Sequence, residues 1–318
     1  MPTRDLAKLQ TGIWKTINRI EDAYTRELFV NYKIALDDVR VELSKVYEKY
    51  SKAGALTHAE MSKFNRLDKL HEQLSDILGP TLSRNGRLVE DLRKVQYQES
   101  FYRNAWALDQ SSGVSLRWGL LSEKTIEAAV KDDTFAGLLK IAKENVKTDA
   151  MFGIRRTITQ GLIRGESYPK MAREIKDFIE RSASGYVRIV RTEGQRAAVN
   201  GQLTNYDAAR DLGVQVRNIW DATLDKATRP DHGAMDGQVA NEEGYFDTPV
   251  GLQRGPMQSG YAWWDISCRC RVRGQIEGYE PTVRRIRDEE IQPYQTYSEW
   301  AKEKGLKTKL PNRKVYMD

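Results

Sequence analysis

Residues 13–50, IWKTINRIEDAYTRELFVNYKIALDDVRVELSKVYEKY, contain neither glycine nor proline. Apolar side chains recur in this stretch at steps of three or four residues, and charged side chains fill the positions between them. The apolar positions are Ile13, Ile17, Ile20, Tyr24, Leu28, Tyr32, Ala35, Val39, Leu43, Val46 and Tyr50. Because an α-helix has about 3.6 residues per turn, this spacing predicts one or two long amphipathic helices, up to about 60 Å in length.

Helical patterns continue as far as residue 212. Thr57-His58-Ala59-Glu60 is a capping box that is expected to open a second helix, and Gly79-Pro80 is expected to end it. Three further helical stretches follow: residues 88–108, residues 122–179 divided near Gly153, Gly161 and Gly165, and residues 186–212 before a left-handed cap at Gly213.

The pattern changes after Gly213. Residues 214–220 alternate between polar and apolar side chains, which predicts a strand, and a second strand is expected around residues 268–272. We therefore expect an α+β protein in which a long-helix N-terminal half is followed by a small mixed α+β lobe with a few short strands. The expected division is a helical region over residues 1–145, the lobe over residues 146–278 and a polar tail over residues 279–318.

Composition narrows the class of protein. The 318 residues are 40% hydrophobic and 30% charged, and they carry a net charge of +6. No stretch reaches the roughly 20 uncharged apolar residues of a membrane span, and no apolar segment follows the charged N-terminus, so we expect neither a membrane protein nor a secreted one. The two cysteines cannot form a disulfide framework, which favours a reducing compartment. The small positive excess permits a polyanionic partner without requiring one.

Cys268 and Cys270 are candidate metal ligands. On a strand these two residues share one face, so their thiols lie close enough to bind a single soft cation such as zinc. His232, in the loop after the first predicted strand, and Asp265 are the further ligands that we propose. The alternative is structural, with two small buried cysteines beside a hydrogen-bonded histidine. Zinc is the only cofactor that these residues suggest.

A polar stripe precedes the first predicted strand. Within Arg191-Thr192-Glu193-Gly194-Gln195-Arg196 and the following Asn200, the residues Glu193, Arg196 and Asn200 share one side of the predicted helix. Such a stripe beside a core is either catalytic or a brace. We interpret it as a brace and nominate no catalytic residue. The expected structural network consists of Arg191, Glu193, Arg196, Asn200, Asp225 and Arg229.

Arginines alternate with the two cysteines. Arg269, Arg271 and Arg273 share the opposite face of the expected strand, and guanidinium groups suit phosphate contacts. These three residues, with Arg284 and Arg285 of the tail, are candidate nucleic-acid contacts. The nearby aromatic residues Tyr261, Trp263 and Trp264 could stack on bases. The alternative is a solvated basic face beside tryptophans of the core.

The order of the short motifs adds a resemblance. Gly165-Glu166-Ser167-Tyr168 and Arg191-Thr192-Glu193 are followed by Asp225-x-x-Thr228-Arg229-Pro230-x-His232-x-x-x-Asp236-Gly237 and then by Ser267-Cys268-Arg269-Cys270. This succession, over roughly residues 150–275, resembles the phage head morphogenesis family, the Mu F-like minor head proteins of tailed phages. The chain departs from the family pattern at Ser267, where asparagine is usual, and at Lys226-Ala227. Some relatives place cysteines at the positions of Arg229 and His232 and a histidine at the position of Asp265, a substitution pattern that a metal-binding or covalently braced site would show.

The resemblance implies a structural component of the virion and not an enzyme. Such a protein is assembled in the cytoplasm of the bacterial host and lies inside the head, near the portal. The implied partners are the portal protein or the inner capsid, with packaged DNA as a further contact, and neither a membrane nor a small-molecule substrate. The predicted helices suit partner contacts, and the arginine-rich lobe suits DNA.

Other classes of function remain open from the sequence. Mu F-like domains occur beside toxin modules, and Arg191 with Glu193 makes an ADP-ribosyltransferase one alternative. A metal-dependent hydrolase built on Asp225, His232 and Asp236 is another, and a general basic nucleic-acid-binding protein is a third. The sequence contains no Walker A loop and no GxGxxG, GxSxG or HExxH motif, so neither enzyme reading has a complete site.

Overall fold

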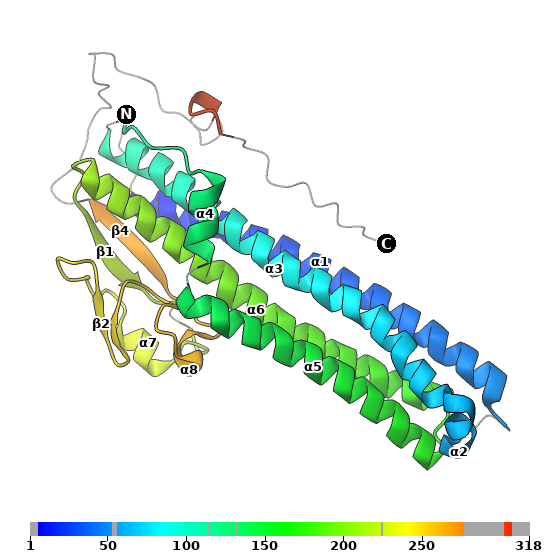
Figure 1. Cartoon of the computed structure of the whole chain (residues 1–318). Coiled ribbons are helices and arrows are strands. Elements are labelled where there is room, and N and C mark those ends of the chain that lie inside the picture. The colour runs from blue at the N-terminus through cyan, green and yellow to red at the C-terminus, as the bar shows by residue number, and fades with distance from the viewer. Residues whose placement is uncertain are drawn as a thin grey trace. The chain divides into compact units, whose positions relative to one another are not determined.

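The computed structural model describes residues 6–52, 56–113, 115–131, 133–223, 225–276 and 302–306, and only the backbone of residues 133–142 and 147. Most of these residues are helical (Figure 1). The helices are α1 (Leu6–Tyr50), α2 (His58–Ser62), the 3-10 turn η1 (Lys63–Asn65), α3 (Arg66–Ser112), α4 (Glu123–Val130), α5 (Asp133–Arg164), α6 (Tyr168–Asp211), α7 (Pro230–Ala234) and α8 (Ala262–Asp265). The strands are β1 (Val216–Asp221), β2 (Phe246–Thr248), β3 (Gly251–Gln253) and β4 (Arg271–Ile276).

The expected fold class is confirmed: long N-terminal helices precede a small C-terminal region with short strands. The predicted helix over residues 13–50 lies within α1, and Thr57 caps α2 by accepting a hydrogen bond from the backbone N–H of Glu60. None of the described helices combines the length and the apolar character that crossing a bilayer requires. The predicted tail lies outside the described residues, apart from residues 302–306.

Three expected helix boundaries are wrong, at Gly79-Pro80, Gly153 and Gly161, because α3 and α5 run through them. α3 runs through Gly79-Pro80, where Leu78 and Leu82 on either side are buried and the proline itself is exposed. Continuous packing of the apolar stripe therefore outweighs the hydrogen bond that the proline cannot donate. α5 likewise runs through Gly153. A Cβ at this position would lie only 1.8 Å from the ring of Phe178, so the glycine allows α5 and α6 to pack closely and does not end the helix.

The chain divides into two compact units. Unit 1 comprises residues 1–23, 91–135 and 191–318, and unit 2 comprises residues 24–90 and 136–190, as far as the structure describes them. α1, α3 and α6 contribute residues to both units. The boundary expected near residue 145 falls inside α5.

Unit 2 is a bundle of helical segments from α1, α3, α5 and α6 (Figure 1). Apolar side chains from each segment are buried in it, among them Leu28, Leu43, Leu74, Ile158 and Ile175. Two buried tyrosines tie segments together: Tyr47 donates to the carbonyl of Glu166 at 2.7 Å, and Tyr186 donates to the carbonyl of Leu82 at 3.2 Å. The apolar stripes read from the sequence thus cover one another.

Unit 1 contains the strands. β1 and β4 pair antiparallel, from Val216 opposite Ile276 to Asp221 opposite Arg271, and β2 pairs with β3. β1 follows α6 after Gly213, whose φ of +88° matches the predicted left-handed cap. α6 begins eighteen residues before the expected start at residue 186, and β4 begins at Arg271, later than expected. The strands and the short helices α7 and α8 surround the candidate site.

Candidate metal centre and its surroundings

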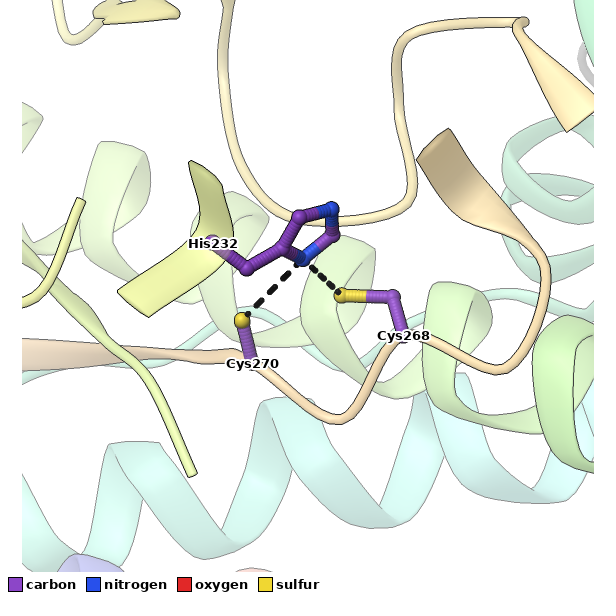
Figure 2. Close-up of side chains that lie close together, drawn as sticks. All are labelled: His232, Cys268 and Cys270. Carbon is purple, nitrogen blue, oxygen red and sulfur yellow. Dashed lines mark hydrogen bonds between the residues drawn. The ribbon is translucent and has the colours of Figure 1, made fainter. Parts of the chain in front are cut away.

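Three of the four proposed metal ligands lie together. His232 comes from α7, and Cys268 and Cys270 come from the segment before β4 (Figure 2). The Nδ1 atom of His232 is 3.3 Å from the Sγ atom of Cys268 and 3.5 Å from that of Cys270. Each of the three side chains is at most 4% exposed. Among the residues that the structure describes, these three side chains are the group that could hold a metal ion.

Local chemistry explains why these segments meet. Pro230 occupies the first turn of α7, where a missing N–H costs no hydrogen bond. Arg229, just before it, donates hydrogen bonds to the carbonyls of Trp264, at 2.9 Å, and Ile266. The ring of Trp264 is fully buried and packs on the imidazole of His232, with ring centroids 4.1 Å apart. Arg229 and Trp264 therefore hold the histidine against the cysteine segment.

The two thiols differ in acidity. A hydrogen bond from Cys268, helped by the neighbouring His232, lowers the pKa of Cys270 to about 5. The same hydrogen bond, together with burial, raises the pKa of Cys268. The lowered pKa of Cys270 favours its thiolate, which is the form that binds soft metal ions.

The geometry fits a tetrahedral metal ion. Zinc bonds of about 2.3 Å to sulfur and about 2.0 Å to nitrogen place those atoms about 3.5 Å apart. The distances of 3.3 Å and 3.5 Å between Nδ1 of His232 and the two sulfurs are close to this value. Nδ1 is the ring nitrogen that faces both sulfurs, whereas the buried Nε2 has no hydrogen-bond partner among the described residues. These three residues could therefore hold a metal ion through Nδ1 and two sulfurs.

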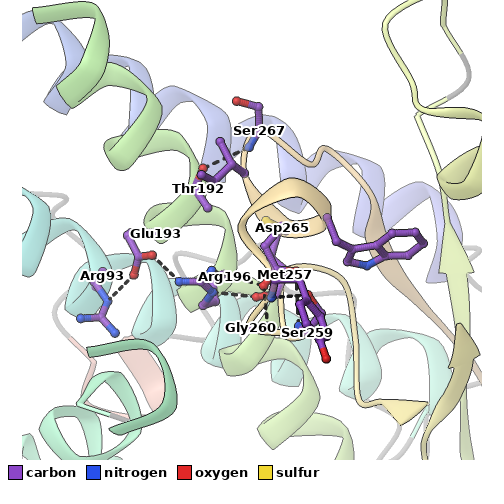
Figure 3. A network of polar contacts seen from close by, with 12 residues as sticks. Arg93, Thr192, Glu193, Arg196, Met257, Ser259, Gly260, Asp265 and Ser267 are labelled. Carbon is purple, nitrogen blue, oxygen red and sulfur yellow. Dashed lines mark hydrogen bonds and ion pairs between the residues drawn. The ribbon is translucent and has the colours of Figure 1, made fainter. Parts of the chain in front are cut away.

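Asp265, the proposed oxygen ligand, is occupied elsewhere and does not join this group. Its carboxylate accepts hydrogen bonds from the backbone N–H of Gly260 at 2.9 Å and from the hydroxyl of Ser259 at 2.8 Å (Figure 3). It also lies 3.6 Å from the guanidinium of Arg196. The physical reason is that the turn before α8 presents the N–H groups of Ser259 and Gly260 to the carboxylate, which directs it away from the sulfurs.

A small hollow of about 110 Å³ opens beside the metal group. Its lining comprises Ala227, Thr228, Arg229, His232, Ser267, Cys268, Arg269 and Cys270. This set contains two guanidinium groups and no carboxylate.

Glu193 and Arg196 belong to a buried chain of alternating charges. Glu193 pairs with Arg196 one turn further along α6, and its other oxygen is 3.3 Å from Nε of Arg93 in α3 (Figure 3). Arg196 continues the chain to Asp265 and donates to the carbonyl of Met257 at 2.6 Å. The four charged side chains are between 2% and 8% exposed. They join α3, α6 and the segment 257–265.

The other residues of the expected network make separate contacts. Arg191 is more than half exposed and lies 3.6 Å from Glu21 of α1, whose pKa burial raises to about 7. Asn200 donates to the carbonyl of Ala129 at 3.3 Å. Asp225 pairs with Arg269, and this hydrogen bond lowers the pKa of Asp225 to about 2. The structure therefore unites Glu193 and Arg196 but not the whole predicted set.

Arg93 was not anticipated from the sequence. It lies in a predicted helix about a hundred positions before Glu193 and belongs to no recognisable motif. The only available signal is a charged residue beside buried positions such as Leu92, which is common on amphipathic helices.

The three described arginines near the cysteines have different surroundings. Arg269 is bound by both oxygens of Asp225, and the guanidinium of Arg271 lies over the ring of Trp14, 4.9 Å from its centroid. Arg273 is exposed. Arg284 and Arg285 lie outside the described residues. The predicted alternation of faces is present, but the expected row offers one exposed guanidinium among these three, and its role with nucleic acid stays a prediction.

Residues 153–273 match the family described as Phage Mu protein F like protein. This part of the chain is Mu F-like. The resemblance drawn from the order of the motifs is therefore confirmed. The Mu F-like region contains His232, Cys268 and Cys270 and the Glu193–Arg196 pair, so both features lie in the part shared with the family.

Relatives extend the similarity beyond the Mu F-like region. The chain is 28% identical over 274 residues to the minor head protein GP7 of Bacillus phage SPP1, covering 85% of this chain and 89% of GP7. It is 26% identical over 275 residues to the NAD(+)–arginine ADP-ribosyltransferase EFV of Enterococcus faecalis, covering 86% of this chain and 56% of that protein. The chain thus spans little more than half the length of the transferase. No solved structure matches the chain.

Proposed function

We propose that this chain is a minor head protein of a tailed phage, a structural component that lies inside the head near the portal. The observation that supports this is the extent of the similarity to GP7, which covers 85% of this chain and 89% of that relative. An alignment of 274 residues extends far beyond the matched region 153–273 and includes residues of both units. The proposed partners are the portal protein or the inner capsid, with packaged DNA as a further contact.

A zinc ion that stabilises the fold is part of this proposal. His232, Cys268 and Cys270 would hold it, and when bound it would cross-link α7 to the segment before β4. The charge chain Arg93–Glu193–Arg196–Asp265 joins the same region to α3 and α6. Both features hold separate segments of the chain together, which is what a stable assembly component requires.

The similarity to EFV makes an ADP-ribosyltransferase the second candidate function. Two observations disfavour it in this chain. Glu193 is 5% exposed and enclosed between Arg93 and Arg196, so it has no access to a nucleotide. Arg191 belongs to the same helix, whereas a nucleotide site draws its groups from separate elements.

A metal-dependent hydrolase also lacks support. In a hydrolase of this kind, a carboxylate near the metal would assist proton transfer to or from the metal-bound water. Asp225 is paired with Arg269, and Asp236 accepts a hydrogen bond from the backbone N–H of Ala222 at 2.9 Å. No carboxylate lines the hollow beside the metal group. We therefore propose a role without enzymatic activity.

The proposal is tested in purified phage particles. Mass spectrometry of particles is expected to detect this chain, and deletion of its gene is expected to reduce the yield of filled heads. A chain that is found free in infected cells and never in particles would overturn the proposal. Incubation of the purified chain with labelled NAD and an arginine-containing acceptor is expected to transfer no label, and transfer would favour the second candidate.

A further inference from the structure

We propose that a metal ion held by His232, Cys268 and Cys270 keeps a fourth coordination position open toward the adjacent hollow, and that a small anion binds there. This inference rests on the metal site of the proposed function and adds to it an exchangeable ligand. Its occupant is a monodentate anion of a few atoms, such as hydroxide or a pseudohalide.

The protein offers three side chains to the metal ion and no fourth one among the described residues. The chain has two cysteines and three histidines in all, and the remaining histidines, His58 and His71, belong to unit 2. Asp265 is bound by Ser259, Gly260 and Arg196. Among the described residues, the group of potential ligands is limited to three. Because zinc bound by nitrogen and sulfur is almost always four-coordinate, three protein ligands leave one position for another donor.

The hollow beside the metal group has room for a further ligand. The hollow of about 110 Å³ is lined by all three ligand residues, so it lies beside the coordination position that they leave open. A water molecule occupies about 30 Å³ of liquid, so the hollow admits water or an anion of a few atoms. Pockets that hold organic ligands are several times larger, about 300 Å³ or more. The hollow is therefore large enough for a small donor.

The lining of the hollow carries positive charge. Arg229 and Arg269 both line the hollow. Arg229 donates to the carbonyls of Trp264 and Ile266 and keeps its positive charge next to the ligands, whereas Asp225 neutralises much of the charge of Arg269. A divalent ion and two thiolates sum to zero charge, so the arginines make the hollow positive. This field favours an anion over a neutral donor.

The test uses the full chain loaded with Co²⁺, whose visible absorption reports its coordination. Thiocyanate is added at constant ionic strength. The expected result is sulfur-to-cobalt absorption on loading, followed by a saturable change in the visible bands as thiocyanate binds. Arg269→Gln is expected to raise the thiocyanate Kd about three- to tenfold, and Arg269→Lys to restore it. Arg273→Gln, on the exposed face of β4 and outside the hollow lining, is the matched control and is expected to change nothing.

The possible outcomes test the metal site, the open coordination position and the charge of the hollow separately. Absence of sulfur-to-cobalt absorption would overturn the metal site and this inference, while the head-protein assignment keeps its own particle-based test. Cobalt binding with no response to thiocyanate would overturn the open position alone. Equal Kd values for Arg269→Gln and Arg273→Gln would overturn the charge argument. If Arg269→Gln does not fold, Asp225→Asn provides the opposite test, since releasing Arg269 from its acid is expected to lower the Kd.

Discussion

Glu193 accepts a hydrogen bond from Arg196, faces Arg93 and is 5% exposed. Removing one member of a buried ion pair leaves the others charged and desolvated. Glu193→Ala is therefore expected to lower the free energy of unfolding by about 3–5 kcal/mol in urea denaturation. Glu180→Ala, which breaks an exposed pair with Lys176 on the same helix, is the control and is expected to change it by less than about 1 kcal/mol.

Glu193→Ala also distinguishes a structural role of this carboxylate from a direct role in function. A Glu193→Ala chain as stable as Glu180→Ala would contradict the structural role. A stable chain that no longer enters particles would instead indicate a direct role for the carboxylate in assembly.

The metal ligands make a second prediction about single residues. Zinc at a thousandfold excess over its Kd is expected to stabilise the chain by about 4 kcal/mol, since only the folded state assembles the three ligands. Thermal unfolding is expected to shift downward when a strong chelator is added to the native chain. The variant Cys268→Ser/Cys270→Ser is expected to show no such shift and no bound zinc by metal analysis. A native chain that melts at the same temperature with and without chelator would contradict the metal site.

At the scale of helices, Gly201 permits a close contact between α6 and α3. A Cβ at this position would lie 2.2 Å from the backbone carbonyl oxygen of Tyr97, and backbone cannot move aside as a flexible side chain can. Gly201→Ala is therefore expected to cost about 3 kcal/mol or more by overpacking. Gly12→Ala in α1 is the matched control, because no atom lies within 4 Å of its added Cβ.

The control is expected to move stability in the opposite direction. Replacing an open helical glycine by alanine stabilises a helix by about 1 kcal/mol. Urea denaturation of both variants measures the difference. Equal effects of the two substitutions would show that the α3–α6 contact is not as close as the structure indicates.

At the scale of the whole molecule, the net charge of +6 permits DNA binding, but the charge is not all available. Asp225 neutralises Arg269, and Arg271 lies over Trp14, whereas Arg273 is exposed. If the chain contacts packaged DNA through β4, Arg273→Gln is expected to reduce the slope of log K against log salt by about 1 in gel retardation. Arg269→Gln is the control and is expected to change the slope little. Retardation that is absent at low salt, or insensitive to salt, would contradict phosphate contacts.

Local patterns in the sequence were sufficient to predict the class of fold and the candidate metal ligands His232, Cys268 and Cys270. The three-to-four-residue spacing in residues 13–50 predicts α1, the capping box predicts the start of α2, and Gly213 predicts the end of α6, because each depends on neighbours within a few residues. The pairing of His232 with Cys268 and Cys270 was proposed from residue type and motif order, and the geometry brings them together.

Packing between segments far apart in the chain overrode some of the local signals and brought distant side chains together. Pro80 and Gly153 read as helix ends, yet α3 and α5 continue, because packing of buried stripes against other helices outweighs local propensity. Arg93 meets Glu193, and Asp265 turns to Arg196 and away from the sulfurs, through contacts between segments far apart in the chain. Such contacts depend on how whole elements pack, and no spacing within a single segment encodes them.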